Sequence, residues 1–359
     1  MPEIVLQIEG KRKAEKKLPE LAGTRGIIFP PKLNLEQSSS EQTARFKASL
    51  LSGSTLMDLT GGFGIDTIAF SKVFEEVVYV ERNKELTEIV RHNLNVLHIS
   101  NVQVKVGDLK EVIGSTAVPD VYYLDPARRI DSKKIVSLKD CEPNVLLLLP
   151  QLIRARQVLI KTSPMLDISK ALEDLSQVSQ VMVVSVENEC KEVLYLLEGN
   201  FEGEPQIKTF NLTRNGVEKF DFIYSEERSC SLKLSEPLKY LYEPNASILK
   251  AGAFKSIALK FGLDKLHRNS HLYTSQALIP GFPGRSFAIK NIVKYSKEAT
   301  KSAIPDLKAN VTTRNFPDSV EVVRRKTGIK EGGDVYVFAT VLTNNKPALI
   351  ITEKINESR

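Results

Sequence analysis

The chain has 359 residues with a formal net charge of +6, and its 42% hydrophobic and 26% charged residues are typical of a globular protein with more than one domain. The longest apolar run, 145–149, is too short to span a bilayer, and no N-terminal stretch has the apolar centre of a signal peptide. Three cysteines without a CxxC pair argue against disulfides and zinc, so we expect a cytoplasmic protein without a membrane or metal partner.

The first 52 residues indicate a helical N-terminal extension. Residues 10–20 predict a short basic helix that ends before Pro19, and Pro30-Pro31 marks a turn. Helical spacing resumes over 41–51, with Ser39 or Ser40 as the N-cap.

Residues 53–200 alternate between short apolar runs and helical stretches. This alternation predicts a doubly wound, mostly parallel sheet. The link between 181–186 and 193–197 is too short for a crossover helix, so these two strands should form an antiparallel hairpin. The other expected strands are 55–59, 77–80, 102–106, 121–124 and 157–160, and the expected helices are 66–74, 84–97, 145–154 and 165–175.

The pattern changes after residue 200. Residues 205–235 predict polar alternating strands, and 238–261 predict a basic helix after a turn. Residues 287–352 predict a small α+β unit of strand, helix (300–307), strand, helix (318–327) and two strands. We expect a linker and a small region over 201–286 and a second small domain over 287–359.

The turn after the first predicted strand has the composition of a nucleotide-cofactor site. Asp58 ends the strand, and Gly62 and Gly64 let the backbone approach a ligand closely before the helix near Asp66. Thr60 stands where the first glycine of such turns usually lies, and its hydroxyl can meet a carboxylate or a water. The complete predicted turn set is Asp58, Thr60, Gly61, Gly62, Phe63, Gly64 and Asp66.

Acids follow the next three strands as well. Glu81, followed by Arg82, can bind both ribose hydroxyls of an adenosine, and Asp108-Leu109 can meet the adenine amino group. Asp125 ends the fourth strand. Each acid alone would be explained as a cap or surface charge, but together they favour S-adenosylmethionine as the cofactor. A nicotinamide dehydrogenase would need GxGxxG, which this turn lacks.

The fourth strand's end predicts the acceptor site. Asp125 can hold or deprotonate an amino group in a turn fixed by Pro126, with capping as the alternative. Glu192 is either a second acid or base, or an edge-strand charge. Lys161 and Arg128 either meet phosphate or form plain salt bridges. We therefore predict Asp125, Pro126, Lys161 and Glu192 as catalytic residues.

The runs MDLTGGFGID, VERN, YLDPARR and VLIK resemble RNA base methyltransferases. The rRNA guanine-N2 methyltransferases have a similar threonine-substituted turn, and the RNA 5-methyluridine family has a similar DPAR. In the latter family a cysteine attacks the base, but here Thr162 stands at that position. A threonine hydroxyl without an activating base is a poor nucleophile, so the resemblance favours direct transfer to a nitrogen.

Over most of its length the chain resembles bacterial class I methyltransferases with a C-terminal THUMP-like domain. The segments that carry this resemblance are LEQSSSEQTARFKA, EPNASILKAGAFK, LHRNSHLYTS and RNFPDSV…GGDVYVFAT. The resemblance implies that Gln42 and Thr43 lie near the methionine end of the cofactor. It also implies a Rossmann-like class I methyltransferase sheet over 53–200, a small ferredoxin-like region within 201–286 and a THUMP-like domain over 287–359 that binds RNA.

The charge distribution agrees with RNA binding by the second half. Residues 1–199 hold 25 basic and 27 acidic side chains, whereas 244–330 hold 16 basic and 5 acidic ones. An incidentally basic face is the alternative. Tyr273, Phe282 and Phe316 could stack on bases, or belong to the core. The predicted phosphate contacts are Arg128, Lys250, Lys255, Lys260, Arg268, Arg285, Arg314, Arg324, Arg325 and Lys326.

We therefore expect an RNA nitrogen methyltransferase that acts on rRNA or tRNA. Two other classes remain open: a non-catalytic RNA-binding or assembly factor with a vestigial cofactor fold, and a methyltransferase that acts on a small molecule or a protein.

Overall fold

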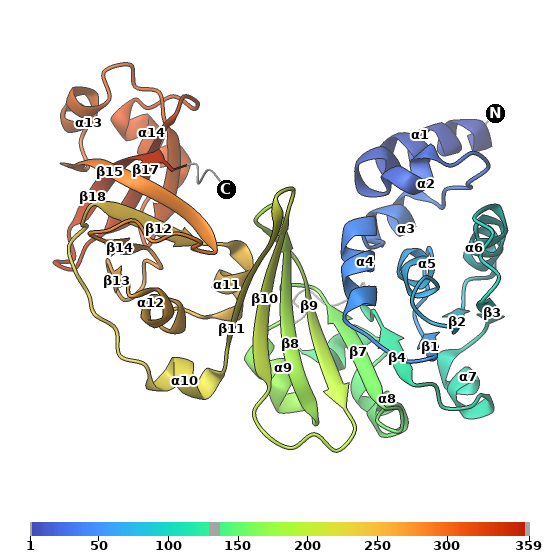
Figure 1. Cartoon of the computed structure of the whole chain (residues 1–359). Coiled ribbons are helices and arrows are strands. Elements are labelled where there is room, and N and C mark those ends of the chain that lie inside the picture. Colours follow the sequence, from blue (N-terminus) through green and yellow to red (C-terminus); the bar gives the residue numbers. More distant parts are fainter. Residues whose placement is uncertain (1, 129–136, 356–359) are drawn as a thin grey trace. The chain divides into compact units, whose positions relative to one another are not determined.

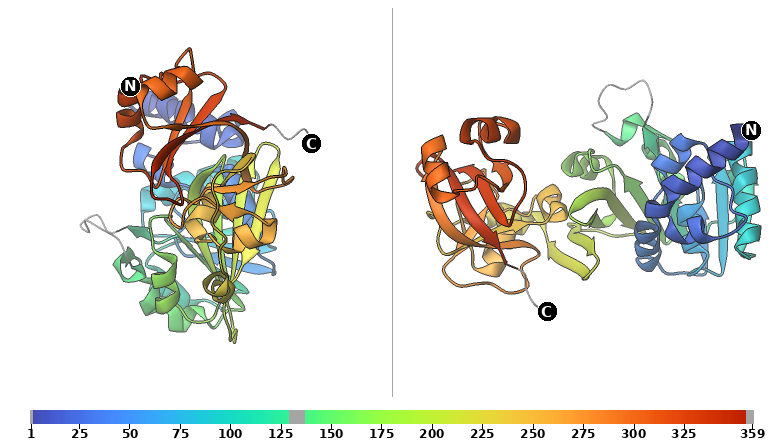
Figure 2. Two further views of the ribbon diagram at one scale, coloured as in Figure 1. Left: turned by 90° about the vertical axis from the view of Figure 1, so that its left-hand side faces the viewer. Right: turned by 90° about the horizontal axis from the view of Figure 1, so that it is seen from above.

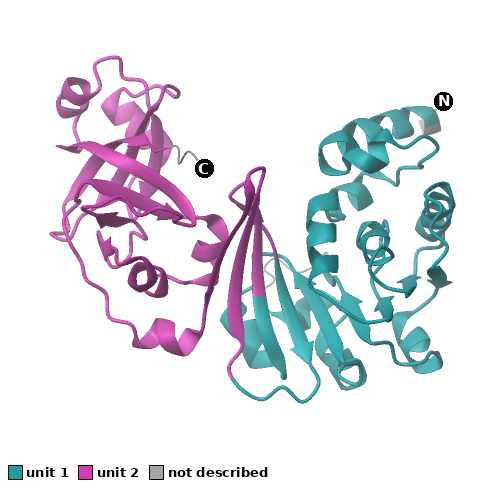
Figure 3. Ribbon diagram, viewed as in Figure 1, with its two compact units in different colours: residues 1–181, 193–203 teal, residues 182–192, 204–359 magenta. Residues whose placement is uncertain are grey.

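The computed structural model describes residues 2–128 and 137–355 (Figures 1 and 2). The chain divides into two compact units (Figure 3). Unit 1 comprises Met1–Val181 and Val193–Gly203, and unit 2 comprises Met182–Glu192 and Glu204–Arg359. No described helix is both long and apolar enough to cross a membrane.

Four helices precede the first strand of unit 1. The first helix ends at Lys17, before Pro19 as predicted, but it begins earlier than expected, at residue 2, where a proline suits the first turn; a second helix starts at Pro19. Ala14 and Leu18 anchor this region because both are fully buried. Ser40 is the N-cap of the fourth helix and accepts from the Thr43 amide. The helices are α1 (Pro2–Lys17), α2 (Pro19–Gly23), α3 (Lys32–Gln37) and α4 (Glu41–Ser49).

The first sheet has the doubly wound arrangement expected from the sequence. Its order through unit 1 is β3-β2-β1-β4-β7-β9, with β9 antiparallel to β7 and the other neighbouring pairs parallel. The strands are β1 (Thr55–Asp58), β2 (Glu76–Glu81), β3 (Val102–Val106), β4 (Val121–Leu124), β7 (Gln157–Thr162), β8 (Val178–Val186) and β9 (Glu189–Glu198).

Helices connect the parallel strands. Four of the five were expected; the sequence did not single out α7, although Asp108 caps it by accepting from the Lys110 amide. The helices are α5 (Ile65–Phe70), α6 (Lys84–Val96), α7 (Leu109–Ser115), α8 (Val145–Leu152) and α9 (Ile168–Asp174). Short elements β5 (Ala127–Arg128), η1 (Leu138–Asp140) and β6 (Cys141–Glu142) lie between β4 and α8.

The expected antiparallel hairpin is β8–β9. Its connection is Glu187-Asn188, and both residues have positive φ, as a two-residue hairpin turn requires. Beyond β8 the sheet continues in unit 2 through β10 (Gln206–Thr213) and β11 (Gly216–Phe222). These are the polar strands that the sequence predicted after residue 200, and α10 (Tyr224–Ser229) follows them.

A second sheet forms the rest of unit 2, in the order β13-β14-β12-β15-β18-β17-β16. From β15 onward, the elements follow the order predicted from the sequence. The elements of this part of the chain are β12 (Tyr240–Pro244), α11 (Ala246–Ala251), α12 (Ser256–Phe261), β13 (Asp264–Lys265), β14 (Tyr273–Ser275), β15 (Gly284–Lys294), α13 (Lys297–Ala303), β16 (Asn310–Arg314), α14 (Val320–Thr327), β17 (Val335–Val341) and β18 (Pro347–Lys354).

The single helix predicted over 238–261 was wrong. The region holds β12 and two short helices, because Asn245 caps α11 and Gly252, with φ 81°, ends it. Leu241 and Tyr242 of β12 are fully buried.

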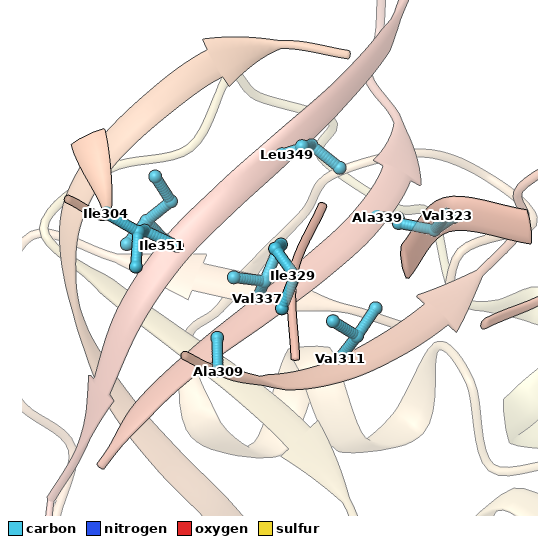
Figure 4. Close-up of a cluster of buried hydrophobic side chains, with 9 residues drawn as sticks. All are labelled: Ile304, Ala309, Val311, Val323, Ile329, Val337, Ala339, Leu349 and Ile351. Atoms are coloured by element: carbon cyan, nitrogen blue, oxygen red, sulfur yellow. The ribbon is translucent and has the colours of Figure 1, made fainter. Parts of the chain in front are cut away.

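Aliphatic side chains bury one face of the second sheet (Figure 4). Val323 of α14 packs with Val311, Val337 and Leu349 from three neighbouring strands. This cluster joins the helices to the sheet in the last part of the chain.

Candidate functional site

The turn after β1 is shaped by an aromatic ring beneath it. A Cβ at Gly61 would lie 2.1 Å from the Tyr79 ring, so this position requires glycine. The Tyr79 hydroxyl donates to the Gly62 carbonyl at 2.7 Å. Gly62 has φ 53°, and a Cβ there would meet no atom closer than 3.8 Å, so its outer face is open.

Asp58 is a buried carboxylate at the start of this turn. It accepts hydrogen bonds from the Thr67 hydroxyl at 2.6 Å and the Thr60 amide at 3.1 Å. Burial raises the pKa of Asp58 to about 7, and the negative charges of Asp66 and Asp125 act in the same direction. Thr67 was not predicted as a site residue.

Glu81, at the end of β2, is tied directly to the turn. Its carboxylate accepts from the Gly62 amide at 3.1 Å and the Asn83 amide at 2.9 Å. Arg82 is exposed, and its guanidinium lies 3.9 Å from Glu142. Asp108 lies at the equivalent end of β3, and Leu109 begins α7 directly after it.

Asp125, after β4, lies beside the same turn because β4 pairs with β1. Its amide donates to the Thr60 hydroxyl at 2.6 Å. Its carboxylate forms an ion pair with Lys161 from the end of β7, the salt bridge that the sequence left open. Pro126 follows and is buried. The Asp125 side chain is 31% exposed, so it is accessible from solvent.

Asp66 lies within a group of buried polar side chains. Its carboxylate accepts from the Ser39 and Tyr123 hydroxyls, both at 2.8 Å, and pairs with Lys47 at 3.2 Å. Burial opposes ionisation of Asp66, but Lys47, Lys161 and the two hydroxyls outweigh it and lower its pKa. Ser39, Lys47 and Tyr123 were not predicted as site residues, because no motif distinguishes them from residues of an ordinary helix or strand.

Further residues named from the sequence differ in burial and in partners. Glu192 is buried within β9, and the Thr162 hydroxyl donates to the Val193 carbonyl at 3.2 Å. Thr43 is buried near the start of α4, whereas Gln42 is exposed. The Arg128 side chain lies outside the described part of the chain.

Unit 2 contains the other predicted basic residues, and three of its arginines have acidic partners. Arg285 Nε lies 2.8 Å and Arg314 Nη2 lies 2.6 Å from the buried Glu243 carboxylate. Arg324 pairs with Glu331 at 3.1 Å.

The remaining predicted RNA contacts differ in exposure. Lys260, Arg268, Arg325 and Lys326 are exposed, while Lys250 and Lys255 are half-buried. Lys326 pairs with Asp318, and Lys255 donates to the Arg228 carbonyl. Of the predicted stacking residues, Tyr273 and Phe282 are buried and Phe316 packs beside the aliphatic cluster.

Within residues 2–128 and 137–355, no three His, Cys, Asp or Glu side chains gather as a metal site would require. His271 instead stacks on Phe254, with ring centroids 3.7 Å apart, and His267 contacts Asn345.

Three parts of the chain match known protein families. Residues 53–126 match the family described as RNA cap guanine-N2 methyltransferase. Residues 240–283 match a ferredoxin-like domain, and residues 284–354 match a THUMP domain-like family. A crystal structure of a protein from Porphyromonas gingivalis W83, described as a methyltransferase, is 36% identical and superposes with a TM-score of 0.92. The match covers 98% of this chain and 90% of that one.

The chain belongs to the methyltransferases with a C-terminal THUMP-like domain.

One curated protein is similar to part of this chain. It is described as an uncharacterized RNA methyltransferase of Protochlamydia amoebophila (strain UWE25), and it is 28% identical over 169 residues. The match covers 45% of this chain and 37% of the relative, so the chain spans little more than a third of that protein's length.

Proposed function

We propose that this methyltransferase uses S-adenosylmethionine to methylate a nitrogen of a base in rRNA or tRNA by direct transfer. The position of Asp125 carries the proposal. Its backbone is fixed by the Thr60 hydroxyl of the glycine turn, and its carboxylate is paired with Lys161 at the edge of the sheet. The family match over 53–126 supports an RNA guanine nitrogen as the type of acceptor.

The residues present fit an adenosyl cofactor. The open outer face of Gly62 leaves room beside the turn, and the Glu81 carboxylate is held next to that room by the Gly62 and Asn83 amides. Glu81 would bind the ribose hydroxyls, and Asp108 with Leu109 would meet the adenine. The cofactor supplies a methyl group activated on a sulfonium.

Asp125 would orient the acceptor amino group and take its proton as the methyl group is transferred. Lys161 holds the Asp125 carboxylate in one position, and Pro126 restricts the backbone that follows. The Thr162 hydroxyl is bound to a backbone carbonyl, which supports transfer without a covalent enzyme–base intermediate. Glu192 remains a proposed second acid or base.

We propose that unit 2 binds the RNA backbone through the exposed basic side chains of residues 244–330, among them Arg268 and Arg325. We also propose the following limits: helical extension 1–52, methyltransferase domain 53–200, linker and ferredoxin-like region 201–286, and THUMP-like domain 287–359.

Binding of S-adenosylhomocysteine and analysis of RNA nucleosides test the function. We expect the compound to raise the melting temperature of the wild type and of Asp125→Asn, because Asp125 acts mainly on the acceptor. Mass spectrometry should find a base methylated on nitrogen in wild-type cells that is missing from cells carrying only Asp125→Asn.

The outcomes separate the alternatives. No thermal shift in the wild type would indicate a vestigial cofactor fold. A shift with the same RNA modifications in wild-type cells and in cells lacking the gene would indicate a small-molecule or protein acceptor. A modification that is lost without the gene but kept in Asp125→Asn cells would remove Asp125 from the transfer step.

A further inference from the structure

Lys47, from helix α4 of the N-terminal extension, is completely buried. Its ammonium lies 3.2 Å from the Asp66 carboxylate and 3.1 Å from the Ser39 hydroxyl. The Ser39 hydroxyl itself donates to Asp66. Two residues of the extension therefore hold one carboxylate at the start of α5, and α4 packs directly against α5 (Figure 1).

A buried ion pair of this kind needs an explanation other than stability. The Coulomb attraction inside a protein roughly offsets the loss of hydration, so replacing both partners by uncharged groups of similar size is often neutral for folding. The ion pair does fix the orientation of its two side chains, because a charged group with several hydrogen bonds has few alternative positions.

Asp66 lies next to the turn that would bind the cofactor, so a fixed Asp66 also restrains that turn. The next residue, Thr67, donates to Asp58, and Asp58 accepts from the Thr60 amide. The hydroxyl of Thr60 in turn accepts from the Asp125 amide. A continuous series of hydrogen bonds and adjacent backbone thus runs from α4 to the edge of the sheet where the acceptor would lie.

We propose that Lys47 is a positioning residue: with Ser39 it fixes Asp66, and thereby the turn of residues 58–67 that would receive the cofactor. The N-terminal extension is then a part of the cofactor site. This inference rests on the proposed use of S-adenosylmethionine.

The test is calorimetric binding of S-adenosylhomocysteine to the full chain, well below its melting temperature. The double variant Lys47→Met/Asp66→Asn removes both charges and leaves no buried ion without its partner. We expect it to bind about tenfold more weakly than the wild type. Ser39→Ala, which keeps both charges, should weaken binding by a smaller factor. Lys72→Met is the matched control, since Lys72 follows α5 but is exposed, and it should bind like the wild type.

Double-variant affinity within twofold of the wild type would overturn the inference, whatever its melting temperature. If the double variant does not fold, unchanged affinity in Ser39→Ala decides against the inference instead. A lower melting temperature with unchanged affinity would mean a purely structural pair. No binding by the wild type would instead contradict the proposed function itself.

Discussion

At the residue scale, charged side chains are concentrated beside the glycine turn that we propose binds the cofactor. Asp58, Asp66 and Asp125 are near enough to one another to affect the pKa of Asp58, and Lys47 and Lys161 counter the charge of Asp66. Asp66 has these two cations and two hydroxyl donors, whereas the hydrogen-bond donors to Asp58 are neutral and the nearby charges that act on its pKa are those of two other acids. The two neighbouring acids therefore shift in opposite directions.

This difference predicts a pH-dependent stability. The pKa of Asp58 rises from 3.8 to about 7 on folding, so the folded protein binds the proton more tightly than the unfolded chain. The free energy of unfolding should fall by about 4 kcal/mol as the pH rises from about 4 to about 7. Asp66, with its lowered pKa, acts below this window: its contribution is present above its unfolded pKa and is lost only in stronger acid.

The comparison of the wild type with Asp58→Asn measures the effect. We expect the melting temperature of the wild type to decline between pH 5 and pH 8 more than that of Asp58→Asn, which has no charge to bury. Asp221→Asn, at an exposed position of β11, is the control. Parallel pH profiles for the wild type and Asp58→Asn would contradict a raised pKa at this position.

At the scale of elements, the β1–α5 turn has two glycines with different physical roles. Gly61 faces inward against the Tyr79 ring, while Gly62 has a left-handed backbone and an open outer face. A sequence motif treats both as one glycine-rich turn. The structure separates the requirement for packing from the requirement for access.

Paired substitutions test this separation. Gly61→Ala should lower the melting temperature, because its Cβ must displace a buried ring. Gly62→Asn should keep the fold, since asparagine tolerates positive φ, but its side chain should block S-adenosylhomocysteine. Melting temperatures and binding affinities of both variants are the measurements. Normal affinity of Gly62→Asn for S-adenosylhomocysteine would refute the assignment of Gly62 to cofactor access.

At the scale of the whole molecule, each compact unit contains a buried carboxylate that is paired with basic side chains. In unit 2 the buried Glu243 holds Arg285 of β15 and Arg314 of β16, so it joins the region that matches a ferredoxin-like domain to the region that matches a THUMP-like one. Removing either arginine would weaken the compensation of a buried carboxylate. These two arginines are therefore poor probes of RNA binding.

The exposed arginines are better probes. We expect Arg268→Glu/Arg325→Glu to weaken RNA binding and reduce its salt dependence by about one unit of slope per lost phosphate contact, while cofactor affinity stays unchanged. Lys219→Glu, on β11, reverses one charge at an exposed position outside the basic region and should bind RNA like the wild type. Filter binding at several salt concentrations would exclude the proposed surface if both variants behaved alike.

The sequence by itself determined the class of the first sheet, its closing hairpin and the acids at its strand ends, because these follow from local hydrophobic period and turn composition. It also predicted the elements after residue 284. It failed at 238–261, where buried strand residues and short capped helices resemble one amphipathic helix.

Only the tertiary structure decided which partners the charged residues take. Lys47 is 19 residues from Asp66, Lys161 is 36 from Asp125, and Glu243 is 71 from Arg314. Such pairs form because packing of α4 on α5 and the order of the strands bring distant positions together. Their energies depend on burial, and burial is a property of the whole fold that local patterns cannot specify.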